Sequence, residues 1–113
     1  MEQELFLPVL SHFENGNFWT ASGGRMRYQV LPDTEAEPPQ LTVEVWEGPW
    51  CRRDSRVEEQ TRFPMSEEGL QALRAFLLDW QEKIAARPER SLEECLRLRD
   101  ARRAELAAQA EQP

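Results

Sequence analysis

The sequence contains little cysteine, with only Cys51 and Cys95 among its 113 residues. Two cysteines so far apart do not make a disulfide framework, and reduced thiols favour a cytoplasmic protein. A zinc site usually shows paired ligands at close spacing, such as Cys-x2-Cys, and neither the cysteines nor His12 has such a partner. We therefore expect no metal ion and no cofactor.

Long hydrophobic runs are also absent. No stretch approaches the ~18 consecutive apolar residues that mark a membrane-spanning helix. The first residues, MEQELFLPVL, show no basic region followed by an apolar run, so we expect no signal peptide. We accordingly expect no membrane among the partners of this protein.

Lysine occurs only once, at Lys83, and every other basic residue is an arginine. The net charge is −7, and an acidic chain repels phosphate at long range, which argues against general nucleic-acid binding. The charge is uneven, because bases outnumber acids in residues 83–103 while acids outnumber bases in residues 1–82. A weakly basic segment is thus expected on an acidic body.

Two stretches show the period-two alternation of half-buried strands. In residues 26–30 apolar side chains alternate with polar ones. In residues 41–46 three aliphatic side chains share one parity, and Trp46 has the opposite parity. If the aliphatic side chains face a covering helix, Trp46 faces away from it.

Weaker signals surround these two strands. Residues 18–20 predict a short strand, and residues 57–63 predict an edge strand or a bulge, because Glu59 interrupts the apolar parity. Residues 1–13 are apolar but short, and we interpret them as an extended segment or a first edge strand. Residues 32–39 are acidic and rich in proline, which is typical of a surface loop.

Residues 66–86 carry the clearest helix signals. Ser66 is a good N-cap, and Met65 with Leu70 has the spacing of a hydrophobic staple. Apolar side chains recur at helical spacing, whereas Gln81 falls on the polar face. Because the sheet needs a cover for one face, we expect this helix to lie across it. The apolar positions are Leu70, Leu73, Phe76, Leu77, Trp80 and Ile84.

A second helix is predicted over residues 91–109, where Ser91 opens a capping-box pattern. Its apolar stripe is poor, because Arg99 and Arg103 fall on it. A helix of this kind is weakly docked, solvated along most of its length, or waiting for a partner. We expect residues 107–113 to fray.

Together these patterns predict an α+β fold. It consists of an antiparallel β-meander of roughly three to five strands, covered on one face by an amphipathic helix, plus a C-terminal helix. We expect a single α+β domain in residues 1–88, followed by the C-terminal helix and frayed tail in residues 89–113.

The candidate site is the stretch from residue 41 to residue 54, where two tryptophans flank a Gly-Pro pair and two arginines follow. One interpretation is an aromatic patch on the open face of the sheet, rimmed by Arg52 and Arg53, that binds a peptide, a flat ring or unstacked bases. The other is that Trp46 and Trp50 pack at a sheet corner, under the N-terminal segment or the C-terminal helix.

No constellation of acid, base and nucleophile stands out, so we expect a protein that is not an enzyme. The favoured function is a small protein-interaction or regulatory module that binds another protein or a second copy of itself. The alternative is a single-stranded nucleic-acid-binding protein that stacks bases on Trp19, Tyr28 or Trp46 and contacts the backbone through arginines, and the acidic charge of the chain disfavours it. These arginines are Arg25, Arg27, Arg52 and Arg53. The residues predicted to bind the partner are Trp46, Trp50, Arg52, Arg53 and Tyr28.

Overall fold

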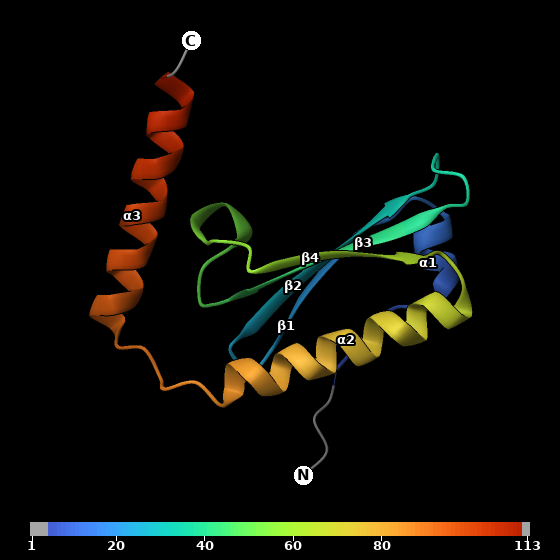
Figure 1. The fold of residues 1–113 in the computed structure, drawn as a ribbon, viewed down its shortest axis with the longest axis horizontal. Coiled ribbons are helices and arrows are strands. Elements are labelled where there is room, and N and C mark those ends of the chain that lie inside the picture. Colours follow the sequence, from blue (N-terminus) through green and yellow to red (C-terminus); the bar gives the residue numbers. More distant parts are fainter. Residues whose placement is uncertain (1–4, 112–113) are drawn as a thin grey trace.

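Four strands form one antiparallel sheet in the order β1-β2-β3-β4 in the computed structural model, which describes residues 5–111 (Figure 1). The helix α2 lies across one face of this sheet, and α3 stands beside the connection between β3 and β4. The predicted α+β class, the antiparallel meander and the two long helices are confirmed. The elements are α1 Leu10–Glu14, β1 Trp19–Gly23, β2 Met26–Asp33, β3 Gln40–Glu47, η1 Arg52–Asp54, β4 Glu59–Pro64, α2 Glu67–Ala85 and α3 Leu92–Glu111.

The core lies between α2 and one face of the sheet. On β3, Leu41, Val43 and Val45 are fully buried, as their shared parity predicts. Tyr28 pairs with Val45 across the two central strands, so its ring shares this face and is only 1% exposed. The opposite parity of β2 and β3 therefore points away from α2.

The start and the buried face of α2 follow from its sequence. Ser66 accepts a hydrogen bond from the backbone N–H of Gly69 at 3.0 Å, which is the predicted N-cap. Burial of its apolar stripe stabilises the fold by about 1.5–3 kcal/mol for each large side chain. The fully or nearly fully buried members of the stripe are Leu70, Leu73, Leu77 and Ile84.

Gln81 is a correction to the predicted polar face of α2, because it is only 9% exposed. Its side chain lies against Gly23, where a Cβ atom would meet the Gln81 Nε2 at 2.8 Å. A glycine at the end of β1 therefore leaves room for an amide that the helical pattern alone assigns to solvent.

Arg25 fixes the C-terminal end of α2 to the first hairpin. Gly24, with a φ of 61°, and Arg25 form the turn between β1 and β2. The Arg25 guanidinium donates to the backbone oxygens of Ile84 at 2.8 Å and Arg87 at 2.7 Å. Ile84 lies in the last turn of α2 and Arg87 just beyond it, and a cation is favourable at this end of a helix.

The N-terminal segment contains no strand in its described part, so the prediction of a first edge strand is wrong. Residues 5–9 lack regular structure and lead into the short helix α1. Their backbone is held by side chains instead, since the Tyr28 hydroxyl donates to Phe6 O at 2.6 Å and Arg74 donates to Leu5 O at 2.7 Å. Residues 1–4 of the predicted segment lie outside the described residues.

Two strand boundaries differ from the pattern. β2 continues through Pro32 to Asp33, so the surface loop is shorter than residues 32–39. The Asp33 side chain accepts from the Ala36 N–H at 3.2 Å and thereby starts the turn. β4 begins at Glu59 and is the predicted edge strand.

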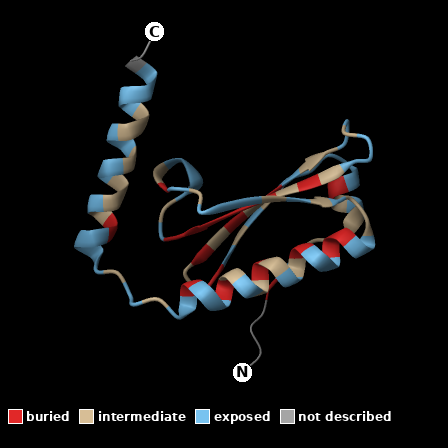
Figure 2. Ribbon diagram, viewed as in Figure 1, coloured by how far each residue is buried: buried red, intermediate tan, exposed pale blue. Residues whose placement is uncertain are grey.

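The helix α3 is capped as predicted, because Ser91 Oγ accepts from the Glu94 N–H at 3.1 Å. It continues to Glu111, and residues 112–113 of the tail that we expect to fray lie outside the described range. Figure 2 shows that most of α3 is exposed, and Cys95 is the buried residue among its described side chains. Its sparse apolar stripe explains this exposure.

Candidate functional site

The second face of the sheet presents polar side chains in cross-strand rows. One row joins Thr20, Gln29, Glu44 and Gln60 through direct pairing of all four strands. Neither α2 nor α3 lies over these rows, and α2 covers the opposite face (Figure 1), whereas the short helix η1 lies on this side, where its Arg52 pairs with Glu44 of β3. The neighbouring row consists of Ser22, Arg27 and Trp46.

A hollow of about 540 Å³ lies at the end of this face, between β1, β2, β3 and the connection that follows β3. Of the described residues 5–111, three arginines line it and no aspartate or glutamate does. All five residues predicted to bind a partner line this hollow, so the structure brings them together. The lining residues are Thr20, Ala21, Ser22, Arg27, Tyr28, Gln29, Trp46, Pro49, Trp50, Cys51, Arg52 and Arg53.

Tyr28 and Trp46 cannot act as exposed aromatic platforms. The Tyr28 ring lies in the core on the α2 side, where burial raises the pKa of its phenol. Trp46 points to the second face but is only 4% exposed, and its indole N–H donates to Trp50 O at 3.0 Å. Trp46 is thus covered, as the packing interpretation expects, but by the connection after β3 and not by the N-terminal segment or the C-terminal helix, and it lines the hollow with little free surface.

Trp50 serves both the hollow and α3. Its indole N–H donates to Cys95 O at 2.8 Å, and the Arg99 guanidinium lies 5.0 Å from the centre of its ring. A cation over an aromatic face contributes about 0.5–1 kcal/mol at exposed sites. Trp50 is therefore one of the residues through which the C-terminal helix contacts the end of the sheet.

Arg52 is held in place by Glu44, a carboxylate that the sequence analysis does not single out. Glu44 is 2% exposed and receives Arg52 at 2.6 and 2.9 Å. Gln29 and Gln60 each donate to it at 3.0 Å. The Arg52 hydrogen bonds lower the pKa of Glu44 below its usual range, despite burial. Its only sequence signal is an acid in the middle of the best strand.

Arg27 and Arg53 line the hollow without a carboxylate partner among residues 5–111. Arg27 donates to Gly24 O at 2.7 Å and packs against Gly48, where a Cβ would meet its Cζ at 2.6 Å. Arg53 is exposed and follows directly after Arg52. Arg27 is not among the five residues predicted to bind a protein partner. The sequence feature that indicates its place is Gly48, because a side chain at that position would collide with the Arg27 guanidinium.

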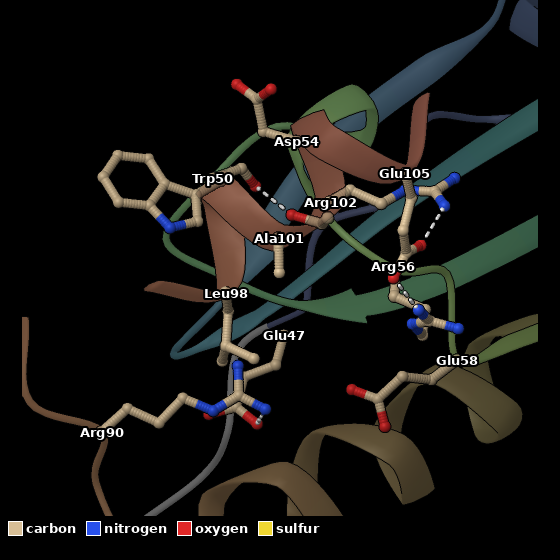
Figure 3. A pocket seen from close by; sticks show the side chains of 11 residues that line it. Glu47, Trp50, Asp54, Arg56, Glu58, Arg90, Leu98, Ala101, Arg102 and Glu105 are labelled. Atoms are coloured by element: carbon tan, nitrogen blue, oxygen red, sulfur yellow. Dashed lines mark hydrogen bonds and ion pairs between the residues drawn. The ribbon is translucent and has the colours of Figure 1, made fainter. Parts of the chain in front are cut away.

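A second hollow, of about 320 Å³, lies between α3 and the end of the sheet. Figure 3 shows acidic and basic side chains facing one another across it. Glu105 pairs with both Arg56 and Arg102, and Arg90 lies 3.3 Å from the buried Glu47. Because these charged side chains pair with one another, we interpret this hollow as the interface at which α3 packs against the end of the sheet.

The remaining chemistry-bearing residues form no cluster. Within residues 5–111 no three His, Cys, Asp or Glu side chains converge as a metal site. The His12 ring lies 2.9 Å from Phe18 O, and Cys51 and Cys95 are free thiols. No helix in the same range is long and apolar enough to cross a membrane.

Comparisons with protein-family models, with curated proteins and with solved structures found no match to this chain.

Proposed function

We propose that this protein is a small, non-catalytic protein-interaction module, and that a segment of the partner protein binds in the hollow on the second face of the sheet. One observation carries the proposal. In a chain of net charge −7, three arginines line a hollow on the sheet face that α2 does not cover, and no carboxylate among residues 5–111 lines it. Positive charge gathered in this way favours an anionic partner through charge complementarity.

A protein segment fits this hollow better than single-stranded nucleic acid does. Base stacking needs exposed aromatic faces. Trp46 and Tyr28 are buried, and Arg99 lies over the Trp50 ring. Trp19 pairs with Val30 on the α2 side of the sheet, away from the hollow. The hydroxyls and guanidiniums that remain suit the carbonyls and carboxylates of a polypeptide.

The lining residues also support a non-catalytic role. Among residues 5–111, no histidine, lysine or carboxylate lines the hollow to act as an acid or base. The Cys51 thiol lies 3.9 Å from Asp54 Oδ2, but the Arg103 hydrogen bonds lower the pKa of Asp54, which makes this carboxylate a poor base for the thiol. A reducing cytoplasm suits an exposed thiol of this kind.

Selection from a displayed library of random dodecapeptides on the full-length chain tests this proposal. We expect related peptides to be enriched and to lose binding when the charge is reversed in Arg53→Glu. Arg97→Glu, which reverses an exposed charge on α3, is the matched control and should leave binding intact. Failure to enrich any peptide, together with salt-sensitive binding of oligothymidylate, would assign the surface to nucleic acid instead.

A further inference from the structure

We infer that the partner segment is extended and acidic, with carboxylates that pair with Arg27 and Arg53. This inference rests on the proposed function, since it names the chemistry of the segment that the hollow receives. It follows from the state of the three guanidiniums, from the edge strand beside them and from the charge of the whole chain.

The three arginines of the hollow differ in whether their guanidiniums already have a carboxylate partner. Arg52 already forms a bidentate pair with the buried Glu44. Among residues 5–111, Arg27 donates to backbone oxygens, at Gly24 and Met26, and has no ion-pair partner. Arg53 likewise forms no hydrogen bond or ion pair among these residues, and the neighbouring Asp54, on which its charge acts, is paired with Arg103. The hollow can therefore bind about two carboxylates of a partner, one at Arg27 and one at Arg53, because the paired N–H groups of a guanidinium match the two oxygens of a carboxylate.

The shape of the hollow favours an extended segment. Its floor includes Thr20, Ala21 and Ser22 of β1, which is the first strand of the sheet. The outer edge of β1 has no strand neighbour among residues 5–111, so its main-chain groups can pair with an added strand. An extended segment alone presents alternate side chains to the arginines while its main chain runs along β1.

Charge excludes the opposite chemistry. A lysine-rich segment meets like charge at Arg27 and Arg53, which costs affinity at an interface. A neutral segment leaves two guanidiniums unpaired when it covers them, and covering an unpaired charge is unfavourable. An acidic segment alone satisfies both free groups.

Fluorescence anisotropy with labelled decapeptides tests the inference on the full-length chain. The probes are a glutamate-rich peptide, an analogue with every glutamate replaced by glutamine, and an analogue with lysine at the same positions. We expect the glutamate peptide alone to bind, more weakly as salt rises to about 0.15 M. Arg53→Gln should weaken it about fivefold, as expected for loss of one exposed ion pair.

Matched variants separate the loss of an arginine in the hollow from the general effect of removing one positive charge from the protein. Arg97→Gln removes the same charge from the exposed side of α3 and should leave the affinity unchanged. Arg27→Lys keeps the charge but not the fork, so it should weaken binding less than Arg27→Gln does. The melting temperature of each variant shows that the fold is retained.

The outcomes distinguish the two proposals. If the glutamine analogue binds as tightly as the glutamate peptide, the acidic partner is wrong and the interaction module stands. If no decapeptide binds, or if phosphatidylserine vesicles or oligothymidylate bind in their place, both are wrong. If Arg97→Gln weakens the glutamate peptide as much as Arg53→Gln does, the hollow is not the site.

Discussion

At the scale of single residues, the second face of the sheet is organised around Glu44. This carboxylate is buried, yet four hydrogen bonds from Arg52, Gln29 and Gln60 satisfy it. Removing one partner of such a pair leaves the other charge without compensation, which costs more than the pair itself contributes. Glu44 therefore couples the stability of the sheet to the position of Arg52.

Glu44→Gln should lower the free energy of unfolding by about 1–3 kcal/mol at pH 7, because it leaves the Arg52 guanidinium unpaired. The pKa of Glu44 is lowered in the folded protein, so its charge stabilises the fold above the ordinary carboxyl pKa of about 4.3. This contribution is lost as the pH falls through the folded pKa. Urea unfolding at neutral and acid pH should show the difference between the two proteins shrinking on acidification.

The exposed Glu59→Gln on β4 is the control for this prediction. It removes a carboxylate from the same sheet with little expected loss. Equal stability losses in the two variants, or a Glu44 effect that grows on acidification, would contradict the account of the buried carboxylate.

At this scale the sequence predicts the core better than the site. Parity alone places Leu41, Val43 and Val45 inside, because burial of aliphatic side chains needs no specific partner. It does not predict that Trp46 is covered or that Arg27 fits over Gly48, since both depend on the path of the chain after β3. The sequence near each arginine likewise does not indicate which carboxylate that arginine pairs with in the fold.

At the scale of elements, α2 and α3 are held by different forces. α2 buries an apolar stripe against the sheet, whereas α3 contacts the η1 connection through polar groups. Arg103 pairs with Asp54 at 3.0 Å, and Trp50 donates to Cys95 O. Exposed ion pairs contribute only about 0.2–1 kcal/mol each, so α3 is the more weakly held helix.

Trp50→Phe should loosen α3, because phenylalanine has no N–H for Cys95 O and is a poorer face for Arg99. Loss of one hydrogen bond of about 0.5–1.5 kcal/mol should raise amide hydrogen exchange in residues 92–106 by about three- to tenfold. Amides of α2 should exchange at the rate of the unmodified protein. Unchanged exchange in α3 would show that the Trp50 contact does not hold the helix.

The two helices also differ in how far the sequence predicts them. The N-cap at Ser66 and the apolar stripe specify both the start and the docking face of α2. For α3 the sequence specifies the helix but not its position, because Arg99 and Arg103 lie on the sparse stripe and find partners about fifty residues away, near Trp50 and Asp54. Gln81 is an exception because it packs against Gly23 of β1, and the helical spacing of apolar residues in α2 carries no information about that contact.

At the scale of the whole molecule, the sheet with α2 forms one core and α3 is an added arm. The buried cluster contains residues from the N-terminal segment, the sheet and α2, and none from α3. Arg25 closes this unit by donating to the carbonyls of Ile84 and Ala85 at the end of α2. We therefore expect residues 1–90 to fold without α3.

A chain that ends at residue 90 should unfold cooperatively and keep Trp46 protected. Its Trp50 loses Cys95 and Arg99, so the iodide-quenchable share of tryptophan fluorescence should rise. Quenching at matched protein concentration, with thermal unfolding followed by circular dichroism, measures both expectations. A truncated chain without a cooperative transition would show that α3 belongs to the folding unit.

A ¹H–¹⁵N NMR titration of the full-length chain with the glutamate-rich decapeptide directly tests whether the hollow is a binding site for an acidic segment. We expect saturable shifts of backbone amides of residues that line the hollow, namely Thr20, Ser22, Arg27, Gln29 and Arg53. The amides of Leu73 and Leu77, on the covered side, should keep their positions. Shifts confined to α2 or α3, or shifts spread over the chain without saturation, would contradict a binding site on the open face of the sheet.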